Sequence, residues 1–87
     1  MANPMTAADL MELGLCRRES EVLVLVGRGK TNAEIGATLN ISPRTVKKHL
    51  ERVFRKLEVR TRTAAVYIAS ESLTHPRAPG IESSLTH

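Results

Sequence analysis

Basic side chains are concentrated between residues 44 and 62, where eight lysines and arginines stand against two glutamates. This stretch carries a net charge of +6, whereas the whole chain of 87 residues carries +4. Ammonium and guanidinium groups donate hydrogen bonds to phosphate oxygens and to base edges, so the stretch favours a surface that binds a polyanion. A solvated helix face would also explain the charge, because many charge runs have that structure. The charge alone leaves both interpretations open.

Base contacts are predicted for the polar residues in the first turns of a helix expected over 43–57. The major groove of B-DNA accepts one α-helix, and the residues near its N-terminus reach deepest. Lysine can donate to guanine O6 and N7, and glutamate can accept from cytosine N4. The residues in this position are Arg44, Lys47, Lys48 and Glu51.

Phosphate contacts are predicted beside these base contacts and further along the same helix. The helix N-terminus and the hydroxyl of Thr45 suit a phosphate oxygen, and Arg52, Arg55 and Lys56 lie where the DNA backbone is expected. His49 is expected to contact phosphate or to pack at the helix flank. A metal role for it is not expected, because no second ligand lies at a useful spacing.

Catalysis is not expected of this chain, because no nucleophile–base pair, phosphate-binding loop or metal cluster is visible in it. The single cysteine, Cys16, rules out an internal disulfide and fits a reducing, cytoplasmic setting. No signal peptide is visible, and the longest apolar run, residues 22–26, is too short to span a membrane. We expect no cofactor, no metal, no small-molecule ligand and no membrane contact.

The elements that must position these side chains are all predicted to be helices. Apolar spacing indicates helices over 17–28, over a segment that begins at a Thr31-x-x-Glu34 capping box, over 43–57 and over about 62–73. Between the second and third of these helices, Asn40 suits a left-handed residue that reverses the chain. Ser42 then caps the third helix, and Pro43 takes its first position. Two helices joined by so short a turn form a helix-turn-helix, which braces the second helix so that its outer face protrudes.

The predicted helices each have an apolar face, and the segments outside them differ in composition. Residues 1–14 form a lead-in that can hold a short helix ending at Gly14, and residues 74–87, rich in Pro and Gly, are expected to be a disordered tail. The inward positions are expected to be Val22, Leu23, Leu25, Val26, Ile35, Leu39, Ile41, Val46, Leu50, Val53, Leu57, Ala65, Val66, Ala69 and Leu73.

Five motifs in order resemble the LuxR-type helix-turn-helix domain, also called the GerE or NarL/FixJ type. The resemblance covers about residues 15 to 69 and is specific, because many separately weak matches fall at the right spacing. The motifs are Leu15-x-x-Arg18-Glu19-x-Glu21-Val22-Leu23, Gly29-Lys30-Thr31-Asn32-x-Glu34-Ile35, Leu39-x-Ile41-Ser42-x-x-Thr45-Val46-Lys47-x-His49, Lys56-Leu57-x-Val59 and Arg62-x-x-Ala65-Val66.

This resemblance implies a compact four-helix bundle over 15–73 that binds double-stranded DNA as a homodimer and regulates transcription in the bacterial cytoplasm, at the nucleoid. It implies that the third helix lies in the major groove and that the fourth helix makes the dimer contact. The family's domain is often the output domain of a response regulator, with RNA polymerase as a further candidate partner. Carried over to this sequence, base contacts fall on Lys47, Lys48 and Glu51, phosphate contacts on Asn32, Thr45, Lys56 and Arg62, and dimer contacts on Ala65, Tyr67 and Ala69. Tyr67 could instead lie at the edge of the core.

Three residues depart from the family pattern. Cys16 replaces the usual threonine, and a thiol is a weak acceptor, so the helix cap is expected to be about 0.5–1 kcal/mol weaker. Gly36 replaces the usual alanine, at a cost of about 1 kcal/mol in helix propensity, but it permits close approach. Glu51 stands where a neutral or basic residue is usual, which leaves the base preference open.

Two other functions remain as alternatives at this stage. One is a promoter-recognition domain of the sigma-factor type, which uses a similar helix-turn-helix. The other is a helix-turn-helix module that binds an acidic partner protein through the same cations.

Overall fold

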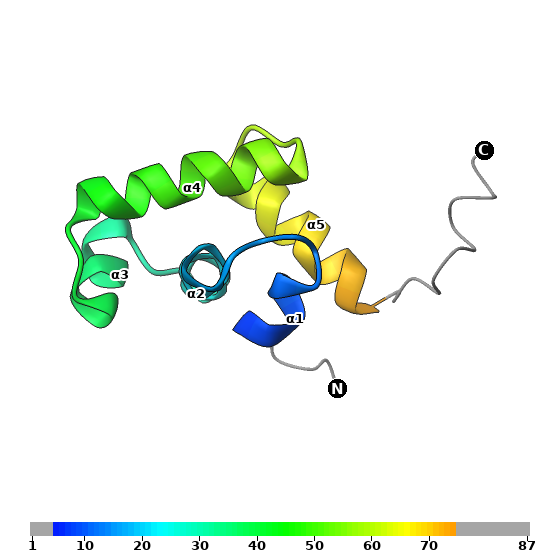
Figure 1. Cartoon of the computed structure of the whole chain (residues 1–87), viewed down its shortest axis with the longest axis horizontal. Coiled ribbons are helices and arrows are strands. Elements are labelled where there is room, and N and C mark those ends of the chain that lie inside the picture. Colours follow the sequence, from blue (N-terminus) through cyan, green and yellow to red (C-terminus); the bar gives the residue numbers. More distant parts are fainter. Residues whose placement is uncertain (1–4, 75–87) are drawn as a thin grey trace.

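A central helix, α2 (Arg17–Gly27), packs against each of the other four helices of the described structure (Figure 1). The computed structural model describes residues 5–74, and the side chains of residues 5–71. The other helices are α1 (Ala7–Met11), α3 (Asn32–Leu39), α4 (Pro43–Leu57) and α5 (Arg62–Thr74). No strand occurs in these residues, so the prediction of an all-α bundle around a helix-turn-helix is confirmed, with α1 added to the four longer helices.

Local sequence chemistry determines where the helices begin. The predicted capping box of α3 is present: the Glu34 N–H donates to Thr31 Oγ1 at 3.1 Å, and the Thr31 N–H donates to Glu34 Oε1 at 2.8 Å. A second such box, between Thr6 and Asp9, begins α1. At the start of α5, the Ala64 N–H donates to Thr61 Oγ1 at 3.0 Å. Such caps satisfy amide groups that have no partner inside the helix.

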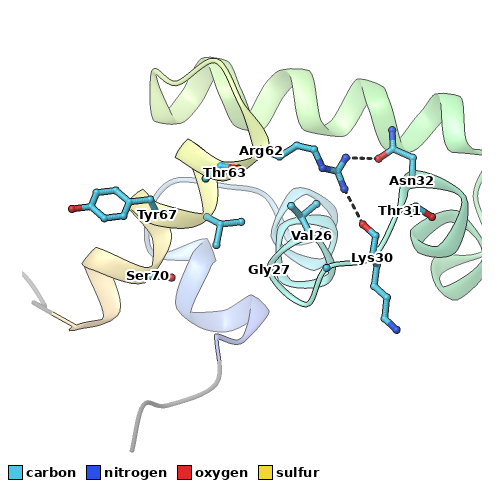
Figure 2. Close-up of a pocket in the computed structure, with 11 residues that line it drawn as sticks. Val26, Gly27, Lys30, Thr31, Asn32, Arg62, Thr63, Tyr67 and Ser70 are labelled. Carbon is cyan, nitrogen blue, oxygen red and sulfur yellow. Dashed lines mark hydrogen bonds between the residues drawn. The ribbon is translucent and has the colours of Figure 1, made fainter.

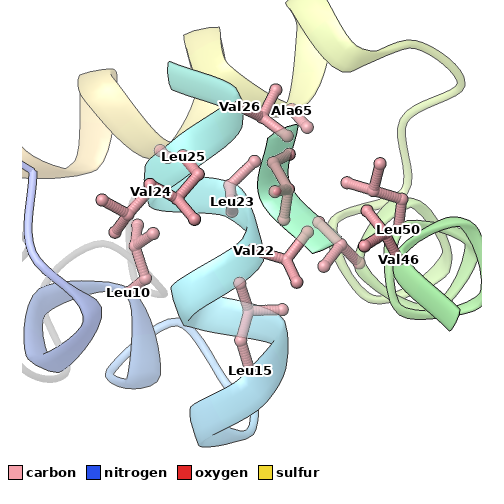
Figure 3. Packing of buried hydrophobic residues seen from close by; sticks show 13 residues of the cluster. Leu10, Leu15, Val22, Leu23, Val24, Leu25, Val26, Val46, Leu50 and Ala65 are labelled. Atoms are coloured by element: carbon pink, nitrogen blue, oxygen red, sulfur yellow. The ribbon is translucent and has the colours of Figure 1, made fainter. Parts of the chain in front are cut away.

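The core surrounds α2, whose residues 22–26 are all buried (Figure 3). The sequence predicted a stripe that left Val24 out, but Val24 is only 9% exposed. The reason is that α2 contacts α1 and α4 as well as α3 and α5, so both sides of it are covered. The thirteen buried apolar residues are Leu10, Leu15, Val22, Leu23, Val24, Leu25, Val26, Ile35, Val46, Leu50, Val53, Ala65 and Ala69.

The predicted inward faces of the other helices are largely confirmed. Leu39, Ile41 and Leu57 are half-buried and pack against the core. Leu10 is fully buried, so α1 is part of the packed bundle. The side chain of Leu73 and the predicted tail beyond Thr74 lie outside the described residues.

Candidate nucleic-acid interface

The turn between α3 and α4 has the geometry that the sequence predicted. Asn40 is left-handed, with φ 61° and ψ 44°, and the Ile41 N–H donates to the Gly36 carbonyl at 2.9 Å. Ser42 then caps α4 by accepting from the Thr45 N–H at 3.1 Å, with Pro43 in the first turn. These contacts fix how α4 leaves the turn.

Gly36 allows this turn to lie very close to α3. It is buried, and a Cβ at this position would lie 2.5 Å from the Ile41 carbonyl oxygen. A carbon atom cannot approach a backbone oxygen so closely without displacing it, so an alanine here would move the turn. The close approach anticipated for Gly36 is therefore present, and it helps to set the position of α4 against α3.

The outer face of α4 is an array of cations, which we call the basic face. Its members project from a helix whose opposite side, at Val46, Leu50 and Val53, is buried. No carboxylate among the described residues forms an ion pair with any of these cations, although Glu51 lies between them. Its exposed residues are Arg44, Lys47, Lys48, Glu51, Arg52 and Arg55.

Thr45 and His49 lie at the flank of this face and are half-buried. The hydroxyls of Thr45 and Ser42 are 3.0 Å apart and share a hydrogen bond. Burial lowers the pKa of His49, and the charge of Arg52 lowers it further, with a smaller opposite effect from Glu19. Both effects favour the neutral imidazole, which would approach a phosphate as a hydrogen-bond donor rather than as a cation.

Lys56 is the one lysine of α4 that has an internal partner. Its Nζ donates to Glu19 Oε1 at 2.8 Å, and the Glu19 side chain is only 3% exposed. The same oxygen accepts from the Cys16 N–H at 2.9 Å. Burial alone would raise the pKa of Glu19, but the hydrogen bonds from Lys56 and Cys16, with the charge of Lys56, outweigh it and hold the pKa below its usual value.

This pair was not predicted, although the sequence contains a signal for it. Lys56 lies three residues after the buried Val53, and Glu19 lies three residues before the buried Val22, so each charge occupies a position on an apolar helix face. Two opposite charges on the packed faces of neighbouring helices indicate an interhelical ion pair.

Arg62 and Asn32, both predicted to contact phosphate, are bonded to each other (Figure 2). The Arg62 guanidinium donates to Asn32 Oδ1 at 2.6 Å and to the Lys30 carbonyl at 2.8 Å. It thereby joins the first turn of α5 to the start of α3, and it borders an open groove of about 820 Å³ that includes Val66 and Tyr67.

The three residues predicted for dimer contacts do not share one surface. Ala65 and Ala69 are fully buried in the core of the single chain, where they cannot meet a second copy. Their small side chains instead allow α5 to approach its neighbours. Tyr67 is 61% exposed and Ile68 is 36% exposed, so the free apolar surface of α5 is centred on these two residues.

No helix of the described part is long and apolar enough to cross a membrane. Within residues 5–71, histidine, cysteine and acidic side chains form no group of three that could hold a metal ion.

A braced helix with unpaired cations on its outer face defines a helix-turn-helix domain of the DNA-binding class. The family model described as "Bacterial regulatory proteins, luxR family" (GerE) matches residues 13–69, so the chain belongs to this family. This membership decides against the sigma-factor alternative.

Two relatives give the family context. The chain is 52% identical over 54 residues to the transcriptional regulatory protein LiaR of Bacillus subtilis, covering 61% of this chain and 26% of that protein. It is 44% identical over 62 residues to the response regulator protein VraR of Staphylococcus aureus, covering 71% of this chain and 29% of that one. The chain thus spans less than a third of the length of either relative. It is a DNA-binding domain of the transcriptional-regulator type and not an enzyme.

Proposed function

We propose that this domain binds a specific DNA sequence by placing α4 in the major groove. The observation that supports this most strongly is the basic face, whose cations are exposed and free of internal carboxylate partners. An unpaired surface cation loses little when it leaves water for a phosphate or a base, and it releases counterions from the DNA. A helix that is buried along its other side keeps those cations in a fixed arrangement.

Base recognition is assigned to the first half of α4. Arg44, Lys47, Lys48 and Glu51 lie within three turns of the Ser42 cap, toward the end of α4 that enters the groove first. Lysine and arginine prefer guanine, and glutamate prefers the amino group of cytosine, so we expect a site that contains G·C pairs.

Phosphate contacts are assigned to residues at the edges of the same surface. Arg52 and Arg55 are exposed further along α4. Thr45 and neutral His49, at the flank, would supply hydrogen bonds without a full charge. Such contacts fix the register of the helix on the DNA and make affinity depend on salt.

Two copies are proposed to bind two half-sites, with α5 as the contact between them. The exposed Tyr67 and Ile68 supply the free apolar surface for that contact. A symmetric dimer would require a palindromic site whose half-sites lie about one helical turn, or a multiple of it, apart.

The role in a longer protein follows from the relatives. Because VraR is a response regulator protein and this chain spans only 29% of it, we propose that the domain serves as the output part of such a regulator. It would then act at the chromosome in the cytoplasm, where a contact with RNA polymerase would link DNA binding to transcription.

Selection of duplexes from a random DNA pool tests this proposal. The expected result is one enriched sequence with G·C pairs, repeated as an inverted pair of half-sites. Enrichment of a single half-site would remove the dimer but keep the base recognition. Recovery of an unenriched pool at every salt concentration would contradict sequence-specific binding and would favour the alternative of a module that binds an acidic protein.

A further inference from the structure

We propose that Lys56 and Arg62 are positioning residues that hold the helix-turn-helix in place and do not contact DNA phosphate. This inference rests on the proposed function of α4. It separates the cations predicted to contact DNA into two groups. Those of the basic face form no ion pair with the described carboxylates, whereas Lys56 and Arg62 are bonded inside the domain.

Lys56 ties the last turn of α4 to the first turn of the central helix α2. Its partner Glu19 is almost completely buried, and one oxygen of that carboxylate accepts from both the Lys56 ammonium and the Cys16 N–H. If Lys56 turned outward to a phosphate, a buried carboxylate would keep only one backbone donor. An uncompensated buried charge is costly, so the internal bond is expected to persist when DNA is bound.

Arg62 connects the start of α5 to the start of α3 through two bonds of one planar guanidinium (Figure 2). The acceptors are Asn32 Oδ1 and the Lys30 carbonyl, which lie on either side of the Thr31 cap. The fork shape of the guanidinium is matched to two such acceptors, and a lysine ammonium cannot reproduce it. Because α4 packs against α3, hydrogen bonds that hold the start of α3 in place also help to position α4.

Arg55 provides the matched comparison. It precedes Lys56 in sequence, is exposed, and forms no ion pair with the described carboxylates. The two neighbours have the same charge on the same helix turn, yet only one of them is bonded internally.

The two roles have different signatures in DNA binding. Removing a phosphate contact lowers the slope of log affinity against log salt by about 0.9, and it weakens binding to all DNA sequences by a similar factor. Removing a positioning residue leaves that slope unchanged, because the number of neutralised phosphates, and so of released counterions, stays the same. It lowers affinity mainly for the specific site, where the base contacts need exact placement of α4.

The experiment measures fluorescence anisotropy with the selected site and with a random duplex, between 50 and 200 mM salt, for folded variants checked by circular dichroism. Raising the salt from 50 to 200 mM weakens the binding of the wild type by a certain factor. For Arg55→Gln this factor should be about 3.5-fold smaller on both duplexes, as expected when one phosphate contact is lost. For Lys56→Gln and Arg62→Gln, the salt dependence should match the wild type. The ratio of their affinity for the selected site to their affinity for the random duplex should fall about tenfold, which is the effect expected of one misplaced base contact.

Two further variants keep the test decisive if one of these fails to fold. Glu19→Gln removes the same ion pair from a side chain that no phosphate would bind, so it should lower the ratio as Lys56→Gln does. Arg62→Lys keeps the charge but cannot make both hydrogen bonds of the guanidinium. It should therefore lower the preference for the selected site and leave the salt dependence unchanged. A slope reduced by one phosphate for Lys56→Gln or Arg62→Gln, or an unchanged ratio, would overturn the inference. If the proposed function itself fails, the wild type will bind the selected site and the random duplex with equal affinity.

Discussion

Replacing Glu58 by glycine is expected to stabilise the domain, because Glu58 ends α4 in a conformation that suits glycine. Its φ is 59° and its ψ is 45°, in the left-handed region, and its backbone N–H donates to the Arg55 carbonyl at 3.3 Å. The left-handed conformation costs a residue with a Cβ about 1–2 kcal/mol. Glycine removes this cost but loses about 0.5–1 kcal/mol through its greater freedom in the unfolded chain.

The charge of Glu58 adds a second, separable contribution. A carboxylate at a helix C-terminus opposes the helix dipole by about 0.3–1 kcal/mol. Glu58→Gly should therefore raise the free energy of unfolding by about 1 kcal/mol, which corresponds to roughly 4–8 °C in Tm for a domain of this size. Glu58→Gln is the matched control, because it removes the charge and keeps the backbone cost. It should therefore raise the free energy of unfolding by less than Glu58→Gly does. Thermal and urea unfolding followed by circular dichroism measure both. A glycine variant that is no more stable than the glutamine variant would show that the left-handed conformation of Glu58 carries no such cost.

Three further predictions concern single side chains. Cys16→Thr should raise the free energy of unfolding by about 0.5–1 kcal/mol by supplying a hydroxyl cap to α2, measured by urea unfolding; a loss of stability would contradict it. Gly36→Ala should destabilise by about 1 kcal/mol, because displacing the turn costs about 1–3 kcal/mol and exceeds the helix-propensity gain. Its control, Ala37→Gly at an exposed position of α3, should lose about 1 kcal/mol from propensity alone, and a stabilising Gly36→Ala would disprove the close contact. Because the pKa of Glu19 is lowered in the folded state, its stabilising contribution is complete above the pKa of the unfolded chain and disappears as pH falls through the folded pKa. Urea unfolding between pH 3 and 6 should therefore show a smaller acid destabilisation in Glu19→Gln than in the wild type.

The parts of this structure that depend on neighbouring residues could be predicted from the sequence. The capping box at Thr31, the left-handed Asn40 and the Ser42–Pro43 helix start each follow from chemistry within four residues. The basic outer face of α4 also followed, because helical periodicity alone separates its charged positions from Val46, Leu50 and Val53.

Contacts between distant segments were the parts that local patterns could not supply. Lys56 and Glu19 are 37 residues apart, and Arg62 and Asn32 are 30 apart. The phosphate contact of Lys56 was predicted from its position on the helix and from the family resemblance, and that of Arg62 from the resemblance. Neither signal shows whether a cation has an internal partner. Which face of α5 is free was also not determined by sequence, since Ala65 fits a helix contact within one chain as well as one between two chains.

The most direct test of the account is the affinity of the double variant Lys47→Ala/Lys48→Ala for the selected site and for a random duplex. We expect the double variant to lose most of its preference for the selected site, by about 10- to 100-fold. A charge-matched control, Arg17→Ala/Arg28→Ala, removes two exposed arginines of α2 and its C-cap and should keep that preference. Unchanged preference in the Lys47/Lys48 variant would show that these lysines do not contact the bases, and it would contradict the proposal that α4 reads the major groove.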